Sequence, residues 1–383
     1  MSTRNVSSNQ GAAVAMGSRT DYGVMKWLSV ACFSILWLVT WTGAPAQVGT
    51  QVNKPAPEQT PGVPFSTQIK KTVIFIQTDC LYEPTAEELA ALPPQEQLKW
   101  TPEALAKLKP EELATLKHVS HSGTGFIVFV PDERVGKDRG FTYLVTNRHV
   151  AQPGIEDGKP CIVVGYSFLL NHRGGSGEPD HLQMVPVVPK DTWWFPDDES
   201  VDLAVTAFSA LQTDWDYQTI PVNLFVSKEM VDQKQVVEGD PVLFSGLFVQ
   251  YEGSSKLEPI VRSGSIAMLP DDPIITTLKK LGRIYLTEAH AFGGNSGSPM
   301  FVDVNKFKGS LGYDYRFLGV VTGEVFEGND LTLQVAATYK GSVAANSDIS
   351  IVVPAEEVKK ILFSPRVQRM RDLSIADVPQ AKN

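Results

Sequence analysis

The segment Thr287–Met300, TEAHAFGGNSGSPM, restricts the fold of this chain more than any other stretch. Small residues stand on both sides of Ser296, and Gly294 lets the backbone take a positive φ angle at little steric cost. Such a turn can aim the amides of Gly294 and Ser296 at one point, as an oxyanion hole requires. Glycine-rich turns are common in proteins, so the segment has to be read together with the rest of the chain.

Two further segments supply the groups that a reactive serine needs. Residues 143–150, YLVTNRHV, place His149 after a run of strand-forming residues, and residues 201–205, VDLAV, place Asp202 before an apolar run. A serine hydroxyl is unreactive at neutral pH until a base removes its proton, and an imidazole with a pKa of about 6.5 can do this. Asp202 would hold the imidazole in one tautomer and stabilise its cation.

Three other acids lie close to Asp202 in the sequence, at positions 197–199. A cluster of acids on a protein surface is commonplace. Asp202 alone is followed directly by an apolar strand that would bury it. We therefore assign the role of orienting His149 to Asp202.

Together the three segments resemble the catalytic motifs of the chymotrypsin-fold serine proteases. Residues 146–149 match the histidine motif with Arg148 in place of the usual Ala, Asp202 begins the aspartate motif, and residues 294–299 match the serine motif. The order His, Asp, Ser is that of this fold and differs from the orders in subtilisin-like and α/β-hydrolase enzymes. The resemblance implies that Ser296 is the nucleophile, His149 the base, and the amides of Gly294 and Ser296 the oxyanion hole.

The fold implied by this resemblance is all-β, with two six-stranded Greek-key β-barrels. His149 and Asp202 would lie on the first barrel and Ser296 on the second, with the active site between them. Apolar runs separated by turn residues recur along the chain, which favours a barrel or sandwich. We expect strands at residues 71–77, 123–130, 141–146, 161–170, 185–188, 202–208, 242–249, 259–267, 283–287, 298–302, 317–325, 333–339 and 349–353.

Residues 239–242, 261–266 and 351–358 narrow the resemblance to the bacterial Deg/HtrA branch, over roughly residues 70 to 362. In that branch a final strand leads through a proline into a closing helix, expected here over residues 355–362. Most members continue into PDZ domains, which we do not expect here. Asn295 also matches this branch, whereas the digestive enzymes have Asp. An amide cannot pair with a freed N-terminal amine, so we expect activation that does not depend on one.

The domain organisation that we expect has a helical insertion, residues 83–117, inside the first barrel. Three related units rich in Glu, Leu and Ala form it, and Thr85 and Thr101, which begin the first two, suit helix N-caps. Its role is open between shading the substrate cleft, binding a partner, and a solvated insertion with no direct role. The expected divisions are residues 1–46 signal peptide, 47–68 flexible linker, 69–215 first barrel, 216–363 second barrel with closing helix, and 364–383 tail.

The N-terminal region has the pattern of an export signal. Residues 27–41 are apolar and uncharged, three basic residues precede them, and Ala44-Pro45-Ala46 fits a small-x-small cleavage site. The apolar run is short for a membrane span, which needs about 20 residues. We favour a cleaved signal peptide and a periplasmic or secreted protein over an uncleaved anchor, which would be the route to a membrane.

Composition excludes several classes of function. The formal net charge is −9 and no basic stripe stands out, which argues against nucleic-acid binding. No Cys-x-x-Cys motif or His-rich cluster suggests a metal site, and the triad needs no cofactor. Cys80 and Cys161 could form a disulfide in an oxidising compartment, or remain two separate thiols at strand ends.

The resemblance also points to residues that would bind substrate. Ala289, His290 and Ala291 would line one wall of the primary pocket. The opposite edge, Thr322-Gly323-Glu324, would pair with the substrate as an added strand. His290 stands where trypsin-like enzymes have Asp, so a preference for Lys or Arg is not supported. Either His290 favours an acidic residue, against the charge of Glu324, or the pocket takes small or medium apolar residues.

The function favoured by these residues is that of an exported serine endopeptidase acting on proteins or peptides through an acyl-enzyme. One alternative is a non-enzymatic module that binds peptides or a partner on a protease fold. Another is a different acyl-transfer hydrolase, such as an esterase, which the order of the motifs disfavours. The sequence leaves the oligomeric state open.

Overall fold

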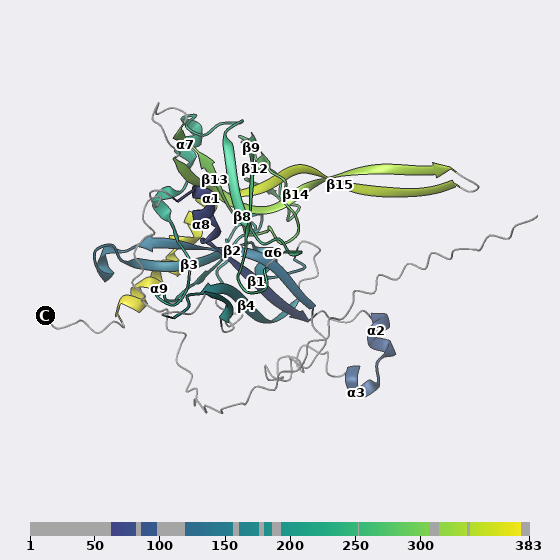
Figure 1. Ribbon diagram of the computed structural model, residues 1–383. Helices are drawn as coiled ribbons and strands as arrows, with labels where there is room; N and C mark the ends of the chain where they lie inside the picture. Colours follow the sequence, from purple (N-terminus) through teal and green to yellow (C-terminus); the bar gives the residue numbers. More distant parts are fainter. Residues whose placement is uncertain are drawn as a thin grey trace, which may run out of the picture. The chain divides into compact units, whose positions relative to one another are not determined.

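The computed structural model describes residues 63–81, 86–97, 119–155, 161–175, 180–185, 193–251, 253–305, 314–334 and 338–376 (Figure 1). The expected signal peptide and most of the expected linker lie outside these residues. No helix in the described ranges is long and apolar enough to cross a membrane.

The first half of the described chain forms a seven-stranded sheet of order β5-β4-β1-β2-β3-β6, with β7 paired to β2. Neighbouring strands are antiparallel except for the β2–β7 pair. The strands are β1 (Val73–Leu81), β2 (Val119–Pro131), β3 (Gly140–Thr146), β4 (Ile162–His172), β5 (His181–Val185), β6 (Ala204–Ala207) and β7 (Ile220–Pro221).

Strands β2 and β3 are buried on both faces, which explains their nearly continuous apolar runs. Successive side chains of a strand point to opposite faces. Phe126 and Tyr143 belong to a core shared with the second half of the chain, whereas Ile127 and Leu144 belong to a core within the first sheet.

The expected closed first barrel differs from the sheet that is observed, because within the described residues the strand path is open. Trp194 forms an isolated bridge to Val205 on the outer side of β6. Residues 186–192, which connect β5 to Trp194 and include most of the strand expected at 185–188, lie outside the described residues. The sheet also continues past the expected boundary at residue 215, because β7 pairs with β2.

The second half of the chain forms the closed six-stranded barrel that the resemblance implied. Its order is β12-β15-β14-β13-β8-β9, and all of its neighbouring strands are antiparallel. Its strands are β8 (Pro241–Gly246), β9 (Ile260–Met268), β12 (Tyr285–Glu288), β13 (Pro299–Asp303), β14 (Tyr315–Gln334) and β15 (Thr338–Pro354), and β10 (Ile274–Ile275) and β11 (Leu281–Gly282) form a separate hairpin.

Strands β14 and β15 are much longer than the expected strands at 317–325 and 349–353. Their pairing continues from Phe326↔Asn346 to Gln334↔Thr338, beyond the residues that pair with β12 and β13. Figure 1 shows this part as a two-stranded ribbon. The strand expected at 333–339 is divided in the structure: residues 333 and 334 end β14, residues 338 and 339 begin β15, and residues 335–337 lie outside the described part.

The insertion into the first sheet contains the helices α2 and α3. The first unit of the insertion is helical, as expected, and its second and third units lie outside the described residues. The helical elements are α1 (Phe65–Lys70), α2 (Ala86–Ala91), α3 (Pro94–Gln97), η2 (Glu133–Val135), α6 (Arg148–Ala151), η4 (Val222–Leu224), α7 (Lys228–Asp232), α8 (Ala355–Leu362) and α9 (Pro365–Ala376).

The end of the expected linker is folded rather than flexible. Residues 65–68 belong to α1, which buries Gln68 and Ile69. Phe65 stacks on Tyr315 of β14 with 3.9 Å between ring centres, so apolar contact with the second barrel holds this turn of helix in place.

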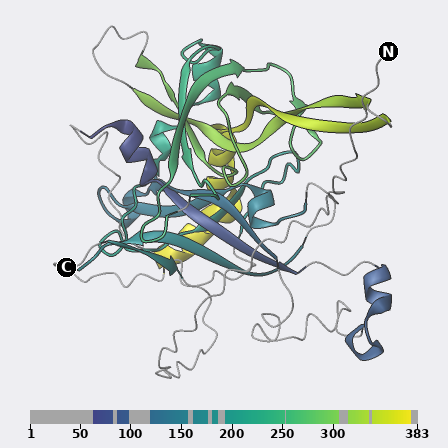
Figure 2. The ribbon, with the colours of Figure 1, turned by 45° about the vertical axis from the view of Figure 1, so that its right-hand side comes forward.

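The C-terminal region contains two helices in place of one helix and a tail. Helix α8 spans the residues expected and packs on the core shared by both halves (Figure 2). Helix α9 follows because Val367 and Arg371 are buried. The guanidinium of Arg371, in a residue only 2% exposed, donates to the carbonyl of Leu362 and the hydroxyl of Tyr143. Burial in this core raises the pKa of Tyr143.

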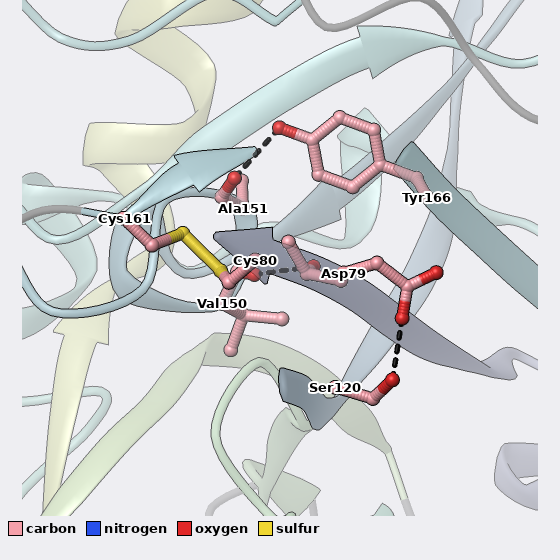
Figure 3. The surroundings of a disulfide bond; sticks show 8 residues. Asp79, Cys80, Ser120, Val150, Ala151, Cys161 and Tyr166 are labelled. Carbon is pink, nitrogen blue, oxygen red and sulfur yellow. Dashed lines mark hydrogen bonds between the residues drawn. A yellow bond between two sulfur atoms is a disulfide. The ribbon is translucent and has the colours of Figure 1, made fainter. Parts of the chain in front are cut away.

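Cys80 and Cys161 form a disulfide, with 5.4 Å between their Cα atoms. Figure 3 shows the bond beside the backbone of Val150 and Ala151 in α6. The carbonyl of Ala151 accepts a hydrogen bond of 2.7 Å from the hydroxyl of Tyr166 on β4, and that of Val150 accepts one of 2.7 Å from a threonine of β1. The short helix that carries His149 is thereby fixed to β1, which contains Cys80, and to β4, which begins directly after Cys161.

Replacing both cysteines by serine is expected to lower the free energy of unfolding by about 4 kcal/mol, because the bond closes a loop with a sequence separation of 81 residues. Chemical denaturation of the native protein and of Cys80→Ser/Cys161→Ser measures this difference. Reduction of the native protein should reproduce it, and equal denaturation midpoints would contradict it.

Candidate active site

Pairing of β3 with β6 brings His149 to Asp202. His149 lies on α6, directly after β3, and Asp202 lies just before β6. Thr146 pairs with Ala204, so the end of one strand meets the beginning of the other. The side-chain amide of Asn147 donates to the carbonyl of Asp202 at 2.8 Å, which fixes the two loops to each other.

The carboxylate of Asp202 is buried and hydrogen-bonded through both oxygens. Its Oδ2 lies 2.6 Å from Nδ1 of His149, and its Oδ1 accepts the backbone N–H of His149 at 3.0 Å. The hydroxyl of Thr322, from β14, also donates to Oδ2, and that of Thr277 lies 3.5 Å from the same atom. Asp202 is only 1% exposed.

Opposing effects set the charge of Asp202. Burial opposes ionisation, but attraction by His149 and the hydrogen bonds from His149 and Thr322 outweigh it, so the pKa of Asp202 is below its usual range. Asp202 is therefore ionised at neutral pH. A carboxylate so placed stabilises an imidazolium and leaves Nε2 of His149 as the nitrogen that exchanges protons.

The three neighbouring acids make other contacts. Asp198 accepts the N–H of Ser200 at 2.9 Å, Glu199 pairs with Lys280 at the surface, and Asp197 is exposed. Of the four acids, Asp202 is the one that the structure pairs with His149.

The turn that carries Ser296 is held by glycines and by the first sheet. Gly294 and Gly297 have φ angles of 95° and 88°. A Cβ on Gly297 would lie 1.9 Å from the carbonyl oxygen of Thr124, so no other residue fits there. Thr124, on β2, donates its N–H to the carbonyl of Ser296 at 2.8 Å and its hydroxyl to the carbonyl of Gly294 at 2.7 Å.

The turn leaves two amides available to a ligand. Within the described residues, neither the N–H of Gly294 nor that of Ser296 donates to an acceptor. The hydroxyl of Ser296 likewise forms no hydrogen bond with another described residue. Bonds between nucleophile and base are often long until substrate is bound, so this geometry is compatible with proton transfer to His149.

Asn295 has a role in this turn that a carboxylate could not fill. Its residue is fully buried, its Nδ2 donates to the carbonyl of Leu247 at 2.5 Å, and its Oδ1 accepts the N–H of Phe292 at 2.9 Å. An ionised Asp has no proton to donate to Leu247. The amide therefore ties the serine turn to the loop after β8 without any freed N-terminus.

His149 and Ser296 line one pocket of about 310 Å³, which places the candidate base and nucleophile together. Four of the expected substrate-binding residues line it too: Ala291, Thr322, Gly323 and Glu324. The pocket is also lined by residues that the sequence did not predict: Thr277, Leu278, Phe292, Gly293 and Val321. Thr277 and Leu278 come from the turn between β10 and β11, where no motif marked them.

Ala289 and His290, which were expected to line the pocket, are not among the residues that line it. Ala289 is 2% exposed in the core of the second barrel, and its carbonyl accepts the hydroxyl of Ser350. The imidazole of His290 pairs with Asp348 instead. A preference for acidic residues based on His290 therefore has no support.

No protein-family model and no curated protein matches this chain. Among solved structures it is similar to the HtrA-type protease AlgW with a decapeptide (14% identity, 80% of this chain and 66% of that chain, TM-score 0.38). It is also similar to the Rv3671c protease of M. tuberculosis H37Rv in an inactive form (17% identity, 82% of this chain and 97% of that chain, TM-score 0.36). A third similar structure is Deg5 (16% identity, 67% of this chain and 81% of that chain, TM-score 0.35). At these identities and TM-scores, what the chain does has to be argued from its own residues.

The Thr322→Val variant is expected to be less stable at neutral pH by about 1–3 kcal/mol, because it removes a hydrogen bond to the buried charge of Asp202. A carboxyl whose pKa is lowered by folding contributes stability above its unfolded pKa and loses it as pH falls through the folded pKa. The difference between variant and native protein should therefore be largest near pH 7 and shrink below about pH 4.

Denaturation midpoints measured from pH 3 to 7 give this difference directly. Thr277→Val is the matched control, because its hydroxyl lies farther from the carboxylate, at 3.5 Å, and its effect should be smaller. A difference for Thr322→Val that does not change with pH would show that the bond does not act through the charge of Asp202.

Proposed function

We propose that this chain is a serine endopeptidase that hydrolyses peptide bonds in protein substrates. One observation carries the proposal: His149, which is paired with the buried Asp202, lines one pocket with Ser296, whose turn leaves the amides of Gly294 and Ser296 available. These are the parts that acyl transfer requires: a nucleophile, a base with its orienting acid, and donors for a developing oxyanion.

In the proposed reaction, Nε2 of His149 takes the proton of the Ser296 hydroxyl as Oγ bonds to the substrate carbonyl carbon. The carbonyl oxygen becomes an oxyanion and accepts the N–H groups of Gly294 and Ser296. His149 then gives its proton to the leaving amine as the C–N bond breaks, which leaves an acyl-enzyme. Water repeats the sequence, and its attack releases the acid and restores Ser296.

The substrate would bind along β14. Val321 exchanges backbone hydrogen bonds of 2.8 and 2.9 Å with Gly297 and Ser298, which fixes that strand beside the serine turn. The following residues, 322–324, line the pocket and would pair with an extended peptide. A pocket of about 310 Å³ lined by Ala291 and Val321 fits a small or medium apolar side chain.

Export belongs to the same proposal. The Cys80–Cys161 disulfide supports an oxidising compartment, where such bonds persist. The apolar run at residues 27–41 would be the signal that directs the chain there. We therefore propose a periplasmic or secreted enzyme.

A fluorophosphonate probe tests the proposal, because it reacts with a serine activated by a neighbouring base. The native protein should be labelled, and Ser296→Ala and His149→Ala should not. Ser298→Ala is the control, since this serine lies in the same turn but is buried with its hydroxyl unbonded in the described residues. An absence of labelling in folded native protein would favour the non-enzymatic binding module.

Asp202→Asn is expected to lower kcat by roughly 10⁴-fold while the protein stays folded, because an amide favours the wrong imidazole tautomer. Steady-state cleavage of casein or a peptide library measures the loss and also separates a protease from an esterase. Asp198→Asn should leave the rate close to native. Comparable rates for Asp202→Asn and native protein would remove Asp202 from the mechanism.

A further inference from the structure

An arginine framed by aromatic rings stands beside the candidate active site. The guanidinium carbon of Arg262, on β9, lies 4.5 Å from the ring centre of Phe292 and 6.0 Å from that of Phe248. The two rings are 5.9 Å apart, and Tyr251 stacks on Phe248 at 5.6 Å. We refer to Phe248, Tyr251, Arg262 and Phe292 as the Arg262 cluster.

The charge of Arg262 has no carboxylate partner among the described residues. Burial alone lowers the pKa of Arg262, with no contribution from a nearby charge. Its Nε is buried and makes no hydrogen bond within the described part of the chain. A half-buried cation without an anion is costly, so this site would gain from a carboxylate ligand more than an exposed arginine would.

The Arg262 cluster adjoins the serine turn. Phe292 lines the pocket with Ser296, and its N–H is held by Asn295. Val249, beside Phe248 in the chain, packs on Gly294, where a Cβ would lie 2.7 Å from its Cγ2. Phe292 and Tyr251 are 37% and 71% exposed, so a ligand can reach the rings.

The position of the Arg262 cluster relative to β14 indicates which part of a substrate would reach it, the part before or the part after the scissile bond. The acyl half is assigned to residues 322–324, on the β14 wall of the pocket. The chain beyond the scissile bond then has to leave past the serine turn, where Phe292 and Val249 lie. This orientation rests on the proposed function.

We propose that Arg262, framed by Phe248 and Phe292, is a subsite for a carboxylate within the first three residues after the scissile bond. The carboxylate is either an Asp or Glu side chain or the C-terminus of the substrate. The planar guanidinium can bind both oxygens at once, and the rings limit access of water to it.

Peptides that differ only after the scissile bond test this subsite. In one series, Glu or Gln stands at one of the three positions after the scissile bond, and the C-terminus is amidated. In the second series, the peptide ends at one of these three positions with a free carboxylate. Native protein should cleave one carboxylate form with about tenfold higher kcat/KM than its neutral match. Preference in the first series identifies a side chain as the source, and preference in the second identifies the C-terminus.

Arg262→Gln should abolish this preference, measured as the ratio of kcat/KM between the carboxylate and the neutral peptides, and Arg262→Lys should retain part of it. Arg283→Gln is the matched control. Arg283 is exposed and lies before β12, at the opposite end of that strand from Arg262, which lies near the residues that follow β12. A native protein that cleaves Glu and Gln peptides equally, with and without a free C-terminus, overturns the inference and leaves the proposed function intact.

Binding to Ser296→Ala decides the inference without catalysis. Fluorescein-labelled Glu, Gln and free-carboxylate peptides are titrated by fluorescence anisotropy. A carboxylate form should bind about tenfold more tightly, and Ser296→Ala/Arg262→Gln should lose the difference. Equal or absent binding overturns the subsite. Failure of the fluorophosphonate probe would instead count against the proposed function alone.

Discussion

The site depends on hydrogen bonds that converge on Thr124, a fully buried residue of β2. Its N–H and hydroxyl donate to two carbonyls of the serine turn. The carbonyl of Thr124 accepts a hydrogen bond from the hydroxyl of Thr146 at 2.6 Å, and its hydroxyl accepts one from the N–H of Leu247 at 2.9 Å. Thr146 ends the strand that leads to His149. One residue of the first sheet thus sets the position of the serine turn of the second barrel relative to the strand of the histidine.

A second connection runs in the opposite direction. Asp202 directly precedes β6 of the first sheet, but Thr322, one of the donors that offset its burial, comes from the second barrel. The carboxylate of Asp202 therefore has all of its hydrogen-bond donors only when the two halves of the chain are packed together. Their shared apolar core, which includes Phe126, Phe317 and helix α8, provides the free energy that keeps this arrangement together.

Much of this arrangement could be predicted from the sequence, because it follows from local patterns. The order of the three motifs, the strand before His149 and the proline before α8 can each be recognised in a short stretch of sequence. The second barrel and helix α8 were predicted from such stretches, and the structure contains both. What could not be predicted depends on contacts between distant residues. Helix α9 forms because Arg371 reaches Tyr143, and His290 leaves the pocket because it meets Asp348. Neither contact has a signature within a short window of sequence.

The close approach of Gly297 to Thr124 limits how this protein can change over evolutionary time. A side chain at position 297 would displace the carbonyl of Thr124, and with it the hydroxyl of Thr146, which would lie 2.5 Å from the added atom. No single substitution elsewhere can relieve this, because the nearest group, the carbonyl of Thr124, belongs to the backbone. Position 297 is therefore restricted to glycine for as long as the serine turn keeps this close contact with β2.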